Sequence, residues 1–433
     1  MELLLESTLM DAYPFKHVRW ENGLEALLIH NPISPVAAYL THYSVGSAQE
    51  TDRQRGLAHF FEHMMFRETE TLRDGDFDRI IAESGGVGLN AFTSYDTTAY
   101  HVNVPSSKLE RVIELEADRM VNLVLSPELI ERERGAVLGE IQMYKDMPSE
   151  QLWNTVMESA FPAHPYRHPI VGYEEQVAAF EIEDFAAFYR AHYAPNRAFV
   201  VIAGQFDEPA LLQALERGYG SLEPGLPRPA DAPPDPPLAE TRRVNIHHDK
   251  ITTDSLVIVA AAPGMRDPDI PALQALSVLL SGGQSSPLYR RLVLEGLATH
   301  ASATVLDVDW MLSSPGLFLI EVGMQHGISA EQGERAVDEV LDRIHSEGIA
   351  PEEFERTANQ VHLSRYTGLR SNMAVARYLG GFGVVCGDPL FGERLAEEME
   401  RVTPDQVIDV LERYVRGAPR VVVVQSPSEA AHR

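Results

Sequence analysis

Short apolar runs along the first half of the chain predict paired strands followed by helices. A hairpin is expected over residues 17–30, because an Asn-Gly dipeptide between two strand-like runs favours a tight reversal. A further strand is expected at 36–44, and a helical stretch begins near Gly56. Apolar positions at helical spacing among charged residues predict a long helix over 129–144.

The second half of the chain repeats this order. Two strands are expected at 243–247 and 255–262, and a helix at about 270–280. Each half also ends in a helix and then a short β-branched strand, at 198–203 and 420–424. The repetition predicts a duplicated α+β unit, in which each of two similar domains is an antiparallel-rich β-sheet covered by helices.

A proline-dense segment separates the two halves. Residues 223–240 read EPGLPRPADAPPDPPLAE and follow neither a helical nor a strand period, so they predict a stiff linker. A chain of 433 residues is too long for one core and suits two domains of about 200 residues each. We therefore expect a first domain at 1–222 and a second at 241–433.

Acidic residues dominate the charge of the protein. Asp and Glu number 64 against 36 Lys and Arg, and the net charge of −28 argues against nucleic acid and anionic membranes as partners. The excess either keeps a large protein soluble or draws basic peptides into a cavity. The single cysteine, Cys386, excludes an intrachain disulfide. No signal peptide or membrane-spanning run is recognised, so the expected location is the cytoplasm.

The candidate chemistry centres on the sequence HFFEH at residues 59–63. On a helix, His59 and His63 share one face, so both imidazoles can reach one metal ion at about 2.0–2.1 Å. Glu62 lies beside His63 and about one turn from His59, where it can act as the base on a metal-bound water. The alternative interpretation is an amphipathic helix with two surface histidines.

The long helix offers two candidates for a third ligand, and a catalytic zinc requires three protein ligands and one open position. Glu133 and Glu140 are seven residues apart and therefore lie on nearly the same face. Glu140 stands among apolar neighbours, where an unpaired carboxylate would be costly. Glu133 has charged neighbours, so its alternative interpretation is a solvated position.

These motifs resemble the M16 family of zinc peptidases, the group of pitrilysin and the mitochondrial processing peptidase. The resemblance covers nearly the whole chain and includes HFFEH, ERGAVLGEI at 133–141 and GGVGLNAFTSYDTTAYHVNVP at 85–105. The spacing of 77 positions from His63 to Glu140 also fits the family. The expected activity is therefore that of a zinc metalloendopeptidase that cleaves unfolded peptides in an enclosed chamber.

The family resemblance also implies roles for individual residues. Glu140 would complete the site for one Zn²⁺ per chain, and Glu133 would be a supporting acid beside the ligand histidines. Glu62 would activate the water and pass its proton to the leaving amine. Asn90 and Ala91 match a family pair on the edge strand that binds the extended substrate backbone. A turn residue is the alternative for Asn90.

The chain departs from the family pattern in two places. Relatives carry an Arg and a Tyr, which contact substrate and oxyanion, in a pattern like S-S-R-L…G-L-A-Y-S. This chain has Pro287 and Thr299 at those positions, so the resemblance implies a heterodimer with a related subunit that supplies both residues. The family often reads F-K-G-T after the motif helix, whereas residues 66–69 here read FRET, in a loop that is expected to supply no ligand.

Two other functions stay open at this point. Some M16-like chains are structural core subunits of respiratory complexes or inactive partners, although these generally have eroded zinc motifs. A dedicated maturase for a single peptide precursor is the second alternative. The sequence does not distinguish such maturation from general degradation of short peptides.

Overall fold

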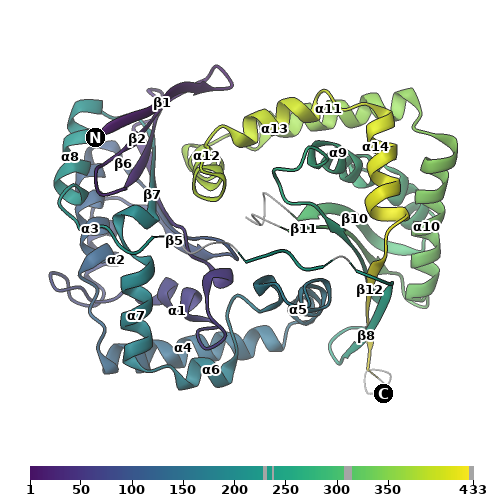
Figure 1. The fold of residues 1–433 in the computed structure, drawn as a ribbon, viewed down its shortest axis with the longest axis horizontal. Helices are drawn as coiled ribbons and strands as arrows, with labels where there is room; N and C mark the ends of the chain where they lie inside the picture. Colours follow the sequence, from purple (N-terminus) through teal and green to yellow (C-terminus); the bar gives the residue numbers. More distant parts are fainter. Residues whose placement is uncertain (228–231, 237, 307–314, 429–433) are drawn as a thin grey trace. The chain divides into compact units, whose positions relative to one another are not determined.

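The computed structural model describes residues 1–227, 232–236, 238–306 and 315–428 (Figure 1). The chain divides into two compact units, each made of discontinuous segments. The first unit comprises Met1–Gln142, Pro169–Ala232 and Gly368–Glu393. The second comprises Met143–His168, Pro233–Thr367 and Arg394–Arg433. Each unit contains one β-sheet and several helices, which confirms the expected α+β class.

The sheet of the first unit has the strand order β1-β2-β3-β7-β4-β6-β5. Strands β3 and β7 are parallel, and all other neighbours are antiparallel. The expected hairpin is formed by β2 and β3. The strand bounds are β1 Glu2–Leu9, β2 Tyr13–Arg19, β3 Glu25–His30, β4 Val36–Tyr43, β5 Val87–Thr93, β6 Thr98–Pro105 and β7 Ala198–Gly204.

The sheet of the second unit has the order β10-β11-β9-β12-β8. Only β8 and β12 are parallel, as β3 and β7 are in the first unit. The strand bounds are β8 Arg242–His248, β9 Ser255–Ala262, β10 Ala298–Leu306, β11 Gly316–Met324 and β12 Arg420–Pro427.

The two sheets share one topology over five strands. The order β3-β7-β4-β6-β5 corresponds to β8-β12-β9-β11-β10, with the same pattern of parallel and antiparallel neighbours. The chain also forms the corresponding strands in the same succession. This correspondence confirms the expected duplication. Strands β1 and β2 extend the first sheet at one edge.

Helices connect the strands in both halves of the chain. The helix expected over 129–144 is α4, and the helix expected at about 270–280 is α9. No helix within the described residues is long and apolar enough to cross a membrane. The helix bounds are α1 Leu57–Met64, α2 Asp76–Glu83, α3 Leu109–Val121, α4 Pro127–Lys145, α5 Pro148–Ala160, α6 Glu174–Ala179, α7 Ile182–His192, α8 Glu208–Tyr219, α9 Ile270–Ser281, α10 Ala330–Glu347, α11 Pro351–Thr367, α12 Asn372–Cys386, α13 Phe391–Met399 and α14 Pro404–Val410.

Each half of the chain contributes one helix to the unit of the other half. Helix α12, from the second half, packs on β4 and β7 in the first unit. Helix α5, from the first half, packs on β9 and β12 in the second unit. Since β9 and β12 correspond to β4 and β7, the exchange is reciprocal. The compact units therefore differ from the two linear halves, 1–222 and 241–433, by these two segments.

Helix α12 lies close to the first sheet because it presents glycine there. A Cβ built on Gly383 would lie 2.5 Å from Cζ of Phe199 on β7, so a larger residue would force the helix outward. Apolar side chains of α12 share a core with this face of the sheet, and those that are buried are Val375, Ala376 and Leu379.

The proline-dense segment contains no helix or strand among its described residues, 223–227, 232–236 and 238–240. Residues 228–231 and 237, which also belong to the expected linker, lie outside the described residues. The function of the segment as a stiff linker stays a prediction.

Candidate metal centre

Helix α1 carries the HFFEH residues, and its start is fixed by contacts with Val171 and Glu50. Gly56 precedes the helix with φ of 102°, and a Cβ there would lie 2.7 Å from the carbonyl oxygen of Val171. The buried Glu50 carboxylate accepts hydrogen bonds from the amides of Gly56 at 2.9 Å and Ala58 at 2.7 Å. Burial raises the pKa of Glu50 to about 8, while these bonds favour its charged form. Glu50 thereby satisfies amides that the helix itself leaves unpaired.

Aromatic packing fixes the rotation of α1 about its axis. Phe60 and Phe61 are fully buried. The Phe60 ring lies edge-on to Phe185 of α7 at 4.7 Å, and the Phe61 ring stacks on Phe188 at 5.2 Å. Since these two residues face the core, the histidines on either side of them face α4.

His59, His63 and Glu140 come together at one point. Glu140 Oε2 lies 3.5 Å from His59 Nε2 and 3.3 Å from His63 Nε2, and the three ligand atoms lie within 4.8 Å of one another. Ligand atoms about 2.0–2.1 Å from one tetrahedral ion are themselves about 3.4 Å apart, so the two measured separations suit a shared ion. Two imidazoles and one carboxylate form a donor set that suits Zn²⁺.

Glu133 is not a member of the ligand cluster but faces the other ring nitrogen of His63. Its Oε2 is 3.8 Å from His63 Nδ1, the ring nitrogen that faces away from Glu140. Its Oε1 forms an ion pair with Arg67 Nε at 3.0 Å. Although burial alone would raise it, the pKa of Glu133 is held below its usual value by His63 and Arg67. A charged Glu133 therefore faces the second nitrogen of a candidate ligand.

The two acids give His63 an unusual affinity for protons. Glu133, and then Glu140, raise the pKa of His63 to about 9 against the opposing effect of burial. A cation that binds through His63 would therefore compete with a proton for the ring.

Glu62 is oriented by a neighbouring strand. Thr93, the last residue of β5, donates a hydrogen bond from Oγ1 to Glu62 Oε2 at 2.7 Å. Glu62 belongs to the same helix as both histidines but is not a member of the ligand cluster. A carboxylate placed in this way, next to candidate metal ligands but outside their group, suits the function of a general base.

Asn90 and Ala91 lie on β5, which is the last strand of its sheet. They are opposite His101 and Tyr100 of β6, respectively. The Asn90 side chain is exposed, whereas the Ala91 side chain is buried in the core on the α1 side. Asn90 is thus part of strand β5 and not of a turn.

Three residues that support the site were not identified from the sequence. Thr93, Arg67 and Glu50 act across 31, 66 and 8 positions of chain, on Glu62, Glu133 and the Ala58 amide respectively. Arg67 belongs to the loop that departs from the family pattern, and that loop supplies no ligand but holds Glu133. No local periodicity distinguishes these residues from ordinary surface or core positions.

Pro287 and Thr299, which stand where relatives carry Arg and Tyr, do not belong to the group of potential metal ligands. Pro287 precedes the helical turn at Tyr289–Leu294, and Thr299 lies on β10. The Thr299 hydroxyl donates to the carbonyl of Gly323 at 3.1 Å. Within the described part of the chain, His59, His63 and Glu140 form the one group of three or more potential metal ligands.

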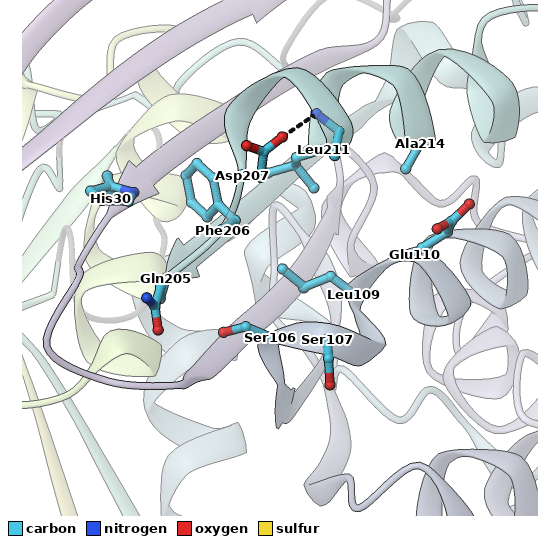
Figure 2. Close-up of a pocket in the computed structure, with 11 residues that line it drawn as sticks. His30, Ser106, Ser107, Leu109, Glu110, Gln205, Phe206, Asp207, Leu211 and Ala214 are labelled. Atoms are coloured by element: carbon cyan, nitrogen blue, oxygen red, sulfur yellow. Dashed lines mark hydrogen bonds between the residues drawn. The ribbon is translucent and has the colours of Figure 1, made fainter.

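A separate cavity of about 560 Å³ opens in the first unit (Figure 2). It lies where β3, β6 and β7 end, whereas Thr93 and Glu62 lie at the opposite ends of these strands. None of the metal-site residues lines it, so it carries no part of the chemistry described here. Its walls are formed by His30, the 106–110 segment, the 205–207 segment and α8, and they include Phe206, Asp207 and Leu211.

The protein is thus a two-unit α+β protein whose first unit contains a candidate metal centre, and comparison with known proteins gives its family. Residues 26–174 match the family model described as insulinase (peptidase family M16). Residues 179–361 match the model described as peptidase M16 inactive domain. The chain therefore belongs to peptidase family M16.

Individual relatives agree with this assignment. The zinc protease PqqE of Helicobacter pylori is 28% identical over 340 residues, which cover 77% of this chain and 75% of that protein. The crystal structure of a protease from Helicobacter pylori superposes with a TM-score of 0.88 at 25% identity and covers 95% of this chain and 99% of that one. The probable mitochondrial-processing peptidase subunit beta of Schizosaccharomyces pombe is 28% identical over 204 residues, 47% of this chain and 44% of that protein.

Proposed function

We propose that this protein is a zinc-dependent endopeptidase that hydrolyses unfolded peptides. One observation carries the proposal: the ligand atoms of His59, His63 and Glu140 converge within 4.8 Å, and Glu62 stands beside them on the same helix as the histidines. Membership of peptidase family M16 and the similarity to a zinc protease support the same activity.

His59, His63 and Glu140 would hold the Zn²⁺. When bound, zinc would act as a Lewis acid that polarises the peptide carbonyl and makes water more acidic near neutral pH. Glu62 accepts a proton from the attacking water and delivers it to the leaving amine. Thr93 holds Glu62 in position for both transfers through its hydrogen bond. Glu133 fixes the orientation of the His63 ring through Nδ1.

The substrate would bind along β5. As the last strand of its sheet, β5 can accept an extended peptide as an additional strand, with main-chain hydrogen bonds that do not depend on sequence. Asn90 would contact the peptide with its side chain and Ala91 with its backbone. Because Thr93 ends the same strand and bonds Glu62, a peptide on β5 would pass close to the catalytic base. Binding in this mode requires an unfolded substrate.

The active enzyme is proposed to be a heterodimer. The positions at which relatives carry a substrate-binding Arg and a Tyr hold Pro287 and Thr299, and neither side chain can replace them. A related subunit would supply these residues, as expected for a chain whose relatives include a peptidase named as a subunit. Size-exclusion chromatography with a peptide assay tests this point. Full turnover by the isolated chain would contradict it, and turnover that requires a second M16-like chain would support it.

The activity itself is tested with Glu62→Gln in the complex purified from its native source. The variant should keep its zinc and lose about 10²–10⁴-fold in turnover of unstructured peptides, because the amide cannot accept a proton. The matched control is Glu70→Gln, which removes an exposed carboxylate from the nearby loop and should change neither property.

Metal content and cleavage profile separate the alternatives. Protein that stays free of zinc in excess metal would support a structural core subunit and exclude the proposed enzyme. Cleavage of one sequence from a peptide library would indicate a dedicated maturase, whereas many cleavage sites would indicate general peptide degradation.

A further inference from the structure

Arg377 lies over the edge strand on the face of the sheet opposite α1. It belongs to α12, and its guanidinium carbon is 5.1 Å from the ring centroid of Phe92 on β5. Its Nη2 lies 2.6 Å from Nε2 of His101 on β6. The residue is exposed, so its charge remains accessible to a ligand beside β5.

The charge of Arg377 is not neutralised by an acid. Within the described residues, Arg377 has a ring contact with Phe92 and a hydrogen-bond contact with His101, and no carboxylate forms an ion pair with it. Burial, and then Arg377 itself, lower the pKa of His101 to about 4, so the imidazole is neutral and accepts the hydrogen bond. An arginine without an acidic partner is unexpected in a protein with 64 acidic and 36 basic residues.

Alternation along β5 divides its side chains between the two faces of the sheet. Ala91 belongs to the core on the α1 side, and Thr93 on the same side bonds Glu62. Phe92 packs into the core on the α12 side, and Asn90 is opposite His101 on that side. A peptide paired with β5 would likewise present alternate side chains to the two faces, and those on the α12 face would approach Arg377.

We propose that Arg377 is a specificity residue that binds a carboxylate of the peptide on β5. This inference rests on the proposed peptidase function and adds a preference to it. One face of the edge strand would lead to Glu62 and the metal ligands, and the other would select substrates by charge. Phe92 and His101 hold the guanidinium over the strand, which reduces the entropy lost when a carboxylate binds.

The first experiment needs no variant. The holoenzyme is assayed on a peptide series in which Glu replaces Gln at each position in turn around one cleavage site. We expect kcat/KM to be about tenfold higher with Glu at one position, as for one charge-assisted hydrogen bond. A matched series with a free or an amidated C-terminus distinguishes a side-chain carboxylate from the terminal carboxylate. No discrimination by charge in either series would overturn the proposal.

Variants then assign the preference to Arg377. Arg377→Met keeps an unbranched stem but no charge, and the Glu/Gln ratio should fall to about one. Arg377→Lys should keep part of the preference, and Arg377→Glu should favour Lys over Gln at the same position. A role in packing alone would lower turnover of all peptides together and leave the ratio unchanged, which would contradict the proposal. Failure of the peptidase function is distinguishable, because then no peptide would be cleaved in a manner that depends on Glu62.

Discussion

Helices α1 and α9 occupy corresponding places in the two units but have different chemistry. Each follows a corresponding strand, β4 or β9, in sheets of the same topology. Helix α1 presents His59, Glu62 and His63 away from its aromatic face. Helix α9 has no ionisable residue, and its buried residues include Ile270, Leu273, Leu276, Leu279 and Leu280.

The partner helices of α1 and α9, which are α4 and α11, also differ in their chemistry. Helix α4 brings Glu140 to the histidines of α1. Helix α11 packs against α9 and joins it through an amide, with Gln360 Nε2 donating to the carbonyl of Gly282 at 2.7 Å. The duplicated scaffold therefore provides a helix pair in both units, and a few side chains in one unit turn that pair into a candidate metal centre.

The largest predicted change in zinc affinity follows substitution of the third candidate ligand, Glu140. Glu140→Gln removes the anionic oxygen that lies within 3.5 Å of both imidazoles, and zinc affinity should fall by at least about 100-fold. Metal titration monitored by calorimetry measures the change.

The matched change in the other unit is Ser277→Ala on α9. The Ser277 hydroxyl donates to the Gln274 carbonyl of its own helix, so zinc affinity should not change. Full zinc affinity in Glu140→Gln would show that α1 and α4 do not share a metal. The two helix pairs would then not differ in metal binding.

A smaller effect is expected at Glu133. Glu133→Gln keeps the shape of the side chain but removes the charge that faces His63 Nδ1 and pairs with Arg67. We expect zinc affinity to fall by about 10–100-fold, as is typical for a group that orients a ligand histidine. Turnover should largely recover at saturating zinc. The control is Glu128→Gln, which changes an exposed acid of the same helix. Equal effects of the two substitutions would argue against an orienting role for Glu133.

The smallest predicted change is in the stability of the protein, and it tests the packing of α12 on the first sheet. Gly383→Ala on α12 places a Cβ 2.5 Å from Phe199 and should lower the free energy of unfolding by about 1–3 kcal/mol. Gly135→Ala on α4 meets no atom within 4 Å and should raise it by up to about 1 kcal/mol, because alanine favours helix. Denaturant unfolding measures both. An unchanged or higher free energy of unfolding in Gly383→Ala would show that α12 does not need its close approach to the first sheet.

Much of the fold was predictable because it depends on local patterns. The Asn-Gly turn of the hairpin, the helical period of α4 and the β-branched strands that end each half are all properties of a few neighbouring residues. Repetition of these patterns was sufficient to predict the duplicated α+β unit. The additional strand β1 was not predicted. It pairs with β2 through residues that do not alternate clearly between buried and exposed.

The residues that can form a metal site were identifiable from the sequence. A spacing of four on a helix brings His59 and His63 to one face, and the family resemblance indicated Glu140 as the third ligand. The folded structure was needed to show that Thr93 bonds Glu62, that Arg67 pairs with Glu133, and that α5 and α12 each belong to the unit of the other half. Helical and strand periods report only on near neighbours, whereas these contacts join segments that packing alone brings together. For the same reason Arg377 resembles any exposed arginine in the sequence, and only the structure places its charge over β5.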